Sequence, residues 1–245
     1  IESITRNPSL SEAYVSLAWV QFAYDWKFKE SERNYRKAIA LDPKFAQAHH
    51  WLGINLTSQG KYEEAYSTLK KAVELDPDNH VVLMNFATGA IETKEFDEAE
   101  VACKRGLSVT PDYYQNWERL YSVYLYQGGR EKDMDDLVKE IESFINKNGL
   151  IYSVLAHYYK DRDTVKFQKY VSEGRSYAET EKGIQLDRYQ LLDGDFSNYM
   201  DEAEKAFEVR KLQYAFGIEV IEYYIGENRD NSRLKALVEK FRKGR

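Results

Sequence analysis

The chain has 245 residues, and with 43% of them hydrophobic it is long and apolar enough to bury a substantial core. Its formal net charge of -6, with acids and bases interleaved, excludes an extended basic face for nucleic acid. One cysteine excludes an internal disulfide framework, and no apolar run is long enough to span a bilayer.

A repeat of about 34 residues runs through the first half of the chain. The prolines recur at steps of 35, 34 and 34 residues and are Pro8, Pro43, Pro77 and Pro111. Aromatic residues that open runs of helix-forming residues follow the same step and are Phe28, Tyr62 and Phe96. A constant period of this length is typical of repeat architectures, in which each copy is one supersecondary unit.

Each copy predicts two amphipathic helices separated by a turn at Asp25, Gly60 or Lys94. Small residues recur in both helices, where the absence of a bulky side chain lets paired backbones approach to about 8 Å. These small residues are Ala18, Gly53 and Ala87 in the first helices, and Ala38, Ala72 and Gly106 in the second helices. Proline closes each second helix because it has no N–H to donate. Three helix pairs are therefore predicted over residues 9–111.

These residues resemble the tetratricopeptide repeat, marked by Trp-x2-Leu-Gly-x2-Tyr, then Ala-x3-Phe, then Pro. The second copy contains Leu52-Gly53, Ala65-x3-Leu69 and Pro77. The fourth begins with Trp117-x2-Leu120-x3-Tyr124, although Tyr121 stands where the pattern has Gly. The resemblance implies an all-α fold, a right-handed α-α superhelix, and an ordinary helical bundle is the alternative.

The pattern weakens after Pro111. Residues 112–146 predict a degenerate fourth unit, and residues 147–245 predict diverged helical repeats with a capping helix over 232–243. We expect one solenoid over residues 1–245. Residues 1–6 align with the end of a second helix and the chain lacks an initial Met, so we expect a piece of a longer protein.

A wider resemblance concerns the segment from Ala23 to Gly53, which is similar to the C-terminal repeat regions of bacterial multidomain regulators. In such proteins the repeats follow a DNA-binding, cyclase or kinase domain. The resemblance implies a signalling role for a soluble module. Its compartment is cytoplasmic by default, or periplasmic if the module is fused to a membrane-anchored regulator.

No constellation for catalysis, a cofactor or a metal occurs in the sequence. His49 and His50 point about 100° apart on a helix, so they cannot share one metal ion, and we expect both to be structural. Cys103 occupies a packed position between helices and is expected to be a buried small hydrophobe. A Gly-rich phosphate loop, a Gly-x-Ser-x-Gly elbow and a His-Glu-x2-His pattern are all missing from the sequence. We therefore expect a protein that is not an enzyme.

The resemblance also implies a concave groove lined by the first helices. The groove residues are predicted to be Val15, Trp19, Phe22, His50, Ile54, Met84, Thr88, Glu118 and Ser122. This set offers no lysine or arginine to clamp a peptide carboxylate, and it favours an apolar peptide or an amphipathic helix. The alternative is that Trp19 and Phe22 pack on a neighbouring helix or on the terminal helices of the chain itself.

The preferred function is a non-catalytic scaffold or sensor that binds a protein or peptide partner. Two alternatives remain open from the sequence. The first repeat could stack on a second copy of the chain, which would make a homo-oligomer. The aromatic residues could instead bind a sugar or an apolar effector, since the chain has 20 Tyr and 4 Trp.

Overall fold

The computed structural model describes residues 9–144, 151–180, 201 and 232–242. These residues form helices joined by turns, with no strand among them. The predicted helix end over residues 1–6 and most of the predicted helical region beyond residue 180 lie outside the described ranges. The described chain contains no helix with the length and apolarity needed to cross a membrane.

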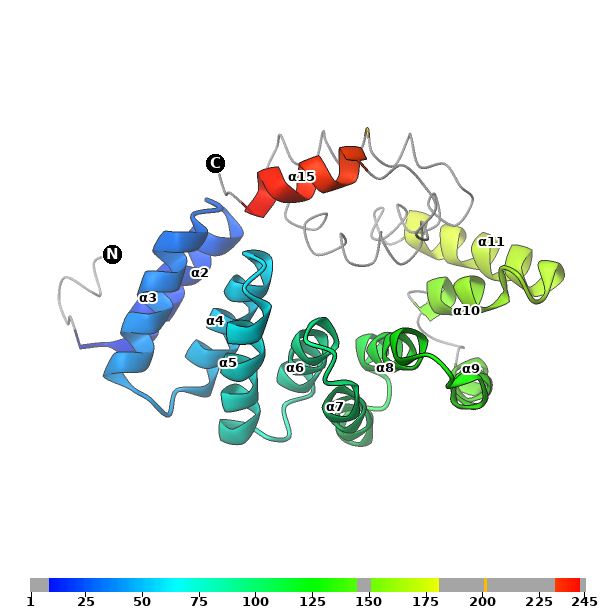
Figure 1. The fold of residues 1–245 in the computed structure, drawn as a ribbon, viewed down its shortest axis with the longest axis horizontal. Helices are drawn as coiled ribbons and strands as arrows, with labels where there is room; N and C mark the ends of the chain where they lie inside the picture. The colour runs from blue at the N-terminus through cyan, green and yellow to red at the C-terminus, as the bar shows by residue number, and fades with distance from the viewer. Residues whose placement is uncertain (1–8, 145–150, 181–200, 202–231, 243–245) are drawn as a thin grey trace. The chain divides into compact units, whose positions relative to one another are not determined.

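The chain divides into two compact units, which are residues 1–110 with 238–245, and residues 111–237. We call them unit 1 and unit 2. The helices of unit 1 are α2 (Ser11–Ala23), α3 (Phe28–Leu41), α4 (Ala46–Ser58), α5 (Tyr62–Leu75), α6 (His80–Glu92) and α7 (Phe96–Val109). In Figure 1 they follow one another as three helical hairpins, coloured from blue to green.

Unit 1 is built by translation of one hairpin. Helix α2 packs on α3, α4 on α5 and α6 on α7. Each second helix also packs on the first helix of the next hairpin, α3 on α4 and α5 on α6. Because the main contacts of each hairpin are with its neighbours, the interior continues from one hairpin to the next, as in other solenoids. The predicted all-α solenoid is confirmed.

Small residues bring the helices of unit 1 close together. The four repeat-related alanines are all fully buried and are Ala18, Ala38, Ala72 and Ala87. A Cβ atom placed on Gly53 of α4 would lie 2.4 Å from Cγ of Leu69 on α5, which is far inside van der Waals contact. A Cβ atom on Gly89 of α6 would lie 3.2 Å from Cδ1 of the same leucine. Leu69 therefore fills the space that glycine leaves on both neighbouring first helices.

The turns inside the hairpins share one backbone conformation. Positive φ angles of 54°, 73°, 64° and 71° occur at Trp26, Gly60, Lys94 and Gly128, which are 34 residues apart. Glycine adopts this left-handed conformation without strain, whereas a bulky side chain rarely does. Trp26 is only 4% exposed, so its burial offsets the conformational cost.

Buried polar side chains connect the helices at defined points. Ser31 of α3 donates its hydroxyl hydrogen to the carbonyl oxygen of Ala18 on α2, over 2.7 Å. Asn55 of α4 donates from Nδ2 to the carbonyl oxygen of Phe28 at the start of α3, over 3.2 Å. The first bond is made inside a hairpin and the second between successive hairpins. Because an unsatisfied buried polar group is costly, both bonds restrict how these helices can slide.

Unit 2 also contains paired helices. They are α8 (Tyr114–Gln127), α9 (Glu131–Phe144), α10 (Tyr152–Tyr159) and α11 (Thr164–Thr180). Helix α8 packs on α9, and α10 packs on α11. A last helix, α15 (Ser232–Arg242), occupies the segment in which the sequence predicts the final helix.

Candidate partner-binding surface

The first helices of unit 1 are almost free of charge. Helices α2, α4 and α6 carry two acidic residues, Glu12 and Glu92, and no lysine or arginine. The second helices α3, α5 and α7 each carry several residues of both signs. We call the partly exposed side chains of α2, α4 and α6 the first-helix surface. Its charge pattern suits apolar or aromatic contacts.

Three aromatic rings gather where α2 meets α4. The Trp19 and Tyr24 ring centroids are 5.4 Å apart with planes at 74°, and the Trp19 and Trp51 centroids are 6.3 Å apart at 76°. Tyr24 is 63% exposed, while the two tryptophans are half-buried. We call these three residues the Trp19 cluster. It places accessible aromatic surface on two successive hairpins.

The predicted groove residues have different environments. The partly exposed ones are Trp19, Met84 and Thr88. The buried ones are Val15, Phe22, His50, Ile54, Glu118 and Ser122. Phe22 is 1% exposed and its ring centroid lies 5.7 Å from that of Phe28, so it belongs to the interior of the first hairpin.

Two of the predicted groove residues belong to the other unit. Glu118 and Ser122 lie on α8, where the Ser122 hydroxyl donates to the Glu118 carbonyl oxygen over 2.9 Å. The other seven lie on α2, α4 and α6, and among them Thr88 donates to the Met84 carbonyl oxygen over 3.1 Å. Sequence reasoning did not select Tyr24 and Trp51. For Trp51, the available signal was its position next to His50 in a segment rich in aromatic residues.

His50 is a buried neutral imidazole. Its Nε2 lies 3.0 Å from Nδ2 of Asn85 on α6, and that amide nitrogen also donates to the Val81 carbonyl oxygen. Because the amide is a donor, Nε2 of His50 accepts and the proton resides on Nδ1. Burial lowers the pKa of His50 to about 4, and the charge of Asp76 offsets only part of this shift. Protonation of His50 would place an N–H donor at Nε2 opposite the N–H donor of the Asn85 amide, which is unfavourable.

The stability of the protein is therefore expected to fall as the pH drops from 6.5 to about 4. In this range the unfolded chain binds a proton at His50 that the folded chain excludes, so the contribution is complete above pH 6.5. Chemical denaturation at several pH values gives the free energy of unfolding as a function of pH. Between pH 4 and 6.5 this free energy should fall less steeply with decreasing pH for His50→Gln than for the natural protein. Equal slopes in the two proteins would contradict this assignment.

The neighbouring His49 makes the opposite kind of bond. Its Nε2 lies 3.0 Å from the carbonyl oxygen of Pro43, which can only accept, so this nitrogen carries the proton. Trp117 occupies the equivalent position 68 residues later, and its Nε1 donates to the Pro111 carbonyl oxygen over 2.8 Å. These bonds satisfy carbonyl groups just after the ends of second helices. Both histidines thus make structural contacts, as the sequence predicts.

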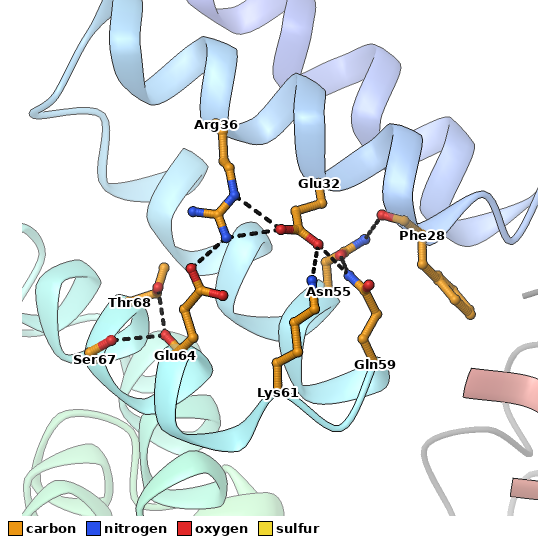
Figure 2. A network of polar contacts seen from close by, with 9 residues as sticks. All are labelled: Phe28, Glu32, Arg36, Asn55, Gln59, Lys61, Glu64, Ser67 and Thr68. Atoms are coloured by element: carbon orange, nitrogen blue, oxygen red, sulfur yellow. Dashed lines mark hydrogen bonds and ion pairs between the residues drawn. The ribbon is translucent and has the colours of Figure 1, made fainter. Parts of the chain in front are cut away.

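A polar network on the other side of the hairpins joins α3 to the second hairpin (Figure 2). The Glu32 carboxylate accepts from Nζ of Lys61 over 2.7 Å, from Nε2 of Gln59 over 2.8 Å and from Nη2 of Arg36 over 2.9 Å. Burial raises the pKa of Glu32, but these hydrogen bonds outweigh it and hold the pKa below its usual value. The carboxylate is charged near neutral pH and keeps the α4–α5 turn against α3.

The ion pairs between second helices follow the repeat. Arg36 of α3 pairs with Glu64 of α5, and Lys70 of α5 pairs with Glu98 of α7 over 2.8 Å (Figure 2 shows the first pair). Both members of the second pair lie 34 residues after those of the first. The ion pairs therefore recur once per hairpin and add to the register set by Ser31 and Asn55.

Replacing Arg36 by Met is expected to lower the free energy of unfolding by about 1 kcal/mol, because its pair with Glu64 is exposed and the Glu32 carboxylate keeps its bonds to Lys61 and Gln59. Salt near 1 M should remove most of this difference by screening. Urea denaturation at low and high salt measures both effects. Arg33→Met is the control, since Arg33 is 75% exposed and pairs with Glu30 of its own helix. A larger loss of stability for Arg33→Met than for Arg36→Met would contradict the role of Arg36 in connecting the hairpins.

A tyrosine cluster in unit 2 surrounds Glu142 of α9. The Glu142 carboxylate accepts from the hydroxyls of Tyr170 over 2.6 Å and Tyr159 over 3.0 Å, and from Nζ of Lys166 over 3.1 Å. Burial raises the pKa of Glu142, but these bonds reverse the shift and keep it below its usual value. The Tyr152, Tyr170 and Tyr159 rings form a stack. Because the polar groups of this cluster are hydrogen-bonded to one another, we interpret the cluster as a structural contact that holds α9, α10 and α11 together.

The described residues offer no grouping of three or more His, Cys, Asp or Glu side chains that could hold a metal ion. Cys103 is fully buried in α7, as predicted from its position in the repeat. Burial lowers the pKa of His157, and the cations Lys160 and Arg162 lower it further. Its Nδ1 lies 3.0 Å from the Tyr121 hydroxyl. Cys103 and His157 therefore both lie in packed surroundings.

Comparisons with known proteins match this architecture. Two family models described as tetratricopeptide repeat match residues 34–66 and 56–123. The tetratricopeptide repeat-containing protein trd-1 of Caenorhabditis elegans is 33% identical over 99 residues, which are 40% of this chain and 13% of that protein. The chain spans 26% or less of the length of the curated relatives that it matches.

Solved structures agree on the fold. PilF of Pseudomonas aeruginosa has a TM-score of 0.58 and 21% identity, covering 98% of this chain and 100% of that one. The tetratricopeptide repeat protein YrrB has a TM-score of 0.54 and 15% identity, covering 71% of this chain and 90% of that one. At these identities the likeness concerns the arrangement of helices.

Proposed function

Because the chain is a tetratricopeptide repeat protein, we propose that it is a non-catalytic scaffold that binds a segment of a protein partner on the first-helix surface of unit 1. The observation that carries this proposal is the Trp19 cluster. It combines two half-buried tryptophans with a tyrosine that is 63% exposed, at the junction of two hairpins. Aromatic side chains that become buried when a partner binds supply much of the energy at protein interfaces.

The surface is formed before the partner binds. Successive hairpins share one interior, and the Ser31 and Asn55 hydrogen bonds hold neighbouring helices in register. The Glu32 network adds a third connection between the first two hairpins. A rigid surface loses little conformational entropy on binding, so more of the contact energy contributes to affinity.

The chemistry of α2, α4 and α6 limits the partner. These helices contain no lysine or arginine, so they cannot hold a terminal carboxylate by charge. They suit a peptide, extended or helical, whose side chains are apolar or pack on aromatic rings. YrrB has a peptide-binding site, which supports the view that this fold can hold a peptide.

The wider setting of the module belongs to the same proposal. The segment from Ala23 to Gly53 resembles repeat regions of bacterial regulators, and this resemblance supports a role as the scaffold or sensing part of a larger regulatory protein. In that setting the partner would be another protein of the same signalling system.

Selection of peptides from a random display library on the full chain tests the proposal. We expect enriched peptides that bind the natural protein and lose about tenfold or more of their affinity to Trp19→Ala, because truncation of an aromatic anchor costs more than about 1.4 kcal/mol. Val101→Ala is the matched control, since Val101 is 68% exposed on α7, a second helix.

Circular dichroism should show that both variants keep the helical content of the natural protein. The proposal is contradicted if no peptide is enriched, or if the enriched peptides bind Trp19→Ala as tightly as the natural protein.

A further inference from the structure

Cations cover several tyrosines of this chain. In the described part of the chain, the tyrosines with a lysine or arginine over the ring, at 4.4 to 5.5 Å from the centroid, include Tyr66, Tyr124, Tyr158, Tyr159 and Tyr170. Such contacts are favourable because the face of an aromatic ring carries negative charge density. The chain therefore uses cation–π contacts repeatedly, each time with a cation of its own.

The Trp19 cluster differs from these tyrosines. Within the described residues, no lysine or arginine lies over Trp19, Tyr24 or Trp51. Tryptophan is nevertheless the aromatic side chain that binds cations most strongly. The cluster thus contains the rings best suited to a cation, at a place where this part of the chain supplies none.

The charges around the cluster favour a cation from outside. Glu12 lies seven residues before Trp19, and residues seven apart share one face of a helix. Lys27, the first lysine after Tyr24, is ion-paired with Asp25 over 3.3 Å. His50, whose ring centroid is 5.3 Å from that of Trp51, is buried as the neutral imidazole. Within the described residues, an incoming cation would therefore meet aromatic rings without a competing cation, and the acidic residue on this face, Glu12, lies about two helical turns away.

We propose that the Trp19 cluster binds the cationic side chain, arginine or lysine, of a partner peptide through its aromatic rings. This inference rests on the proposed function and specifies the chemistry of the partner at that surface. The half-buried tryptophans lie on α2 and α4 and the exposed tyrosine directly follows α2, so one cationic side chain can contact rings from two hairpins. A partner that offers only neutral apolar side chains would use the same surface without this preference.

The first test uses a simple probe and the indole N–H signals of the four tryptophans in nitrogen-15 spectra of the full chain. Tetramethylammonium should shift the signals of Trp19 and Trp51. Neopentyl alcohol, a neutral analogue of similar shape with one additional hydroxyl group, should leave them in place at the same concentration. Trp26 and Trp117 are internal controls because they are 4% and 7% exposed. Equal shifts with both probes, or none with either, would overturn the inference.

The second test separates the inference from the proposed function. In peptides whose binding depends on Trp19, each arginine is replaced by citrulline, which keeps the shape of the side chain and removes its charge. We expect one replacement to weaken binding about threefold to thirtyfold to the natural protein, and to have no such effect on Trp19→Ala. Fluorinated tryptophan, which weakens the negative ring face, should reduce the affinity of the arginine peptide in the same way.

The outcomes of the two tests distinguish the cationic-partner inference from the proposed function. If the peptides depend on Trp19 but tolerate every loss of charge, the proposed function stands and the cationic partner is refuted. If no peptide depends on Trp19, the proposed function fails. In that case shifts with tetramethylammonium alone would still support a cation site at the Trp19 cluster.

Discussion

Replacing Leu69 by Ala is expected to lower the free energy of unfolding by about 2 to 5 kcal/mol. The side chain of Leu69 is 1% exposed and lies against two glycines, Gly53 of α4 and Gly89 of α6. Because those glycines have no side chains to move inward, the space left by the leucine can collapse only partially. The loss therefore includes both the transfer energy of the removed atoms and the cavity.

Urea denaturation followed by circular dichroism measures this loss. Leu69→Met is the control, since a swap that conserves volume costs less than about 1.5 kcal/mol. The same experiment on Lys71→Ala, an exposed position on α5, should show a change within about 0.5 kcal/mol. A loss at Leu69 as small as that at Lys71 would show that Leu69 is not the packing centre of these helices.

Replacing Gly53 by Ala is expected to destabilise the protein by about 1 to 3 kcal/mol, although alanine favours helix. The added Cβ atom would lie 2.4 Å from Cγ and 2.7 Å from Cδ2 of Leu69, so either the leucine or the helix must move. Gly89→Ala is the matched control. Its Cβ atom would meet Cδ1 of Leu69 at 3.2 Å, where the end of that side chain can adjust, and the Tyr66 backbone at an ordinary contact distance of 3.5 Å.

A double-mutant cycle connects the two predictions. Combining Gly53→Ala with Leu69→Ala should cost less than the sum of the single changes, because the smaller side chain removes the clash. Additive losses would show that the cost at Gly53 comes from a contact other than Leu69. A more stable Gly53→Ala protein would contradict the close approach of α4 and α5 altogether.

The fold of unit 1 could be predicted because residues of the same chemical type recur at each step of the repeat. Small residues recur at Ala18, Gly53 and Ala87, since a larger side chain at the closest approach of two helices is excluded. The prediction was less complete at the turns. Gly60 marks its turn plainly, but the equivalent residues Trp26 and Lys94 do not suggest a left-handed backbone by their type.

Charged residues show how one position can carry two roles. The sequence places Glu64 and Glu98 at helix starts, where a negative charge suits the helix dipole. Both acids also pair with cations, Arg36 and Lys70, on the preceding second helix. The pairing could not be predicted from the helix pattern, because it depends on how far successive hairpins are rotated.

The proposed partner-binding surface was harder to predict than the fold. The repeat register places Trp19 and Phe22 on one side of a helix, but Phe22 is 1% exposed against Phe28 whereas Trp19 is half-buried. Tyr24 and Trp51 complete the cluster from outside the predicted set. Side-chain accessibility at a helix junction depends on neighbours distant in sequence, and a repeat pattern does not specify them.

Hydrogen–deuterium exchange of the full chain, with and without a peptide selected on it, tests the central claim most directly. That claim is that stacked hairpins present the Trp19 cluster as a preformed binding surface. We expect the peptide to slow exchange in α2 and α4 only, with α3 and α5 unchanged, because the hairpins need no rearrangement to bind. Slower exchange centred on α3 and α5, or none in α2 and α4, would contradict the account.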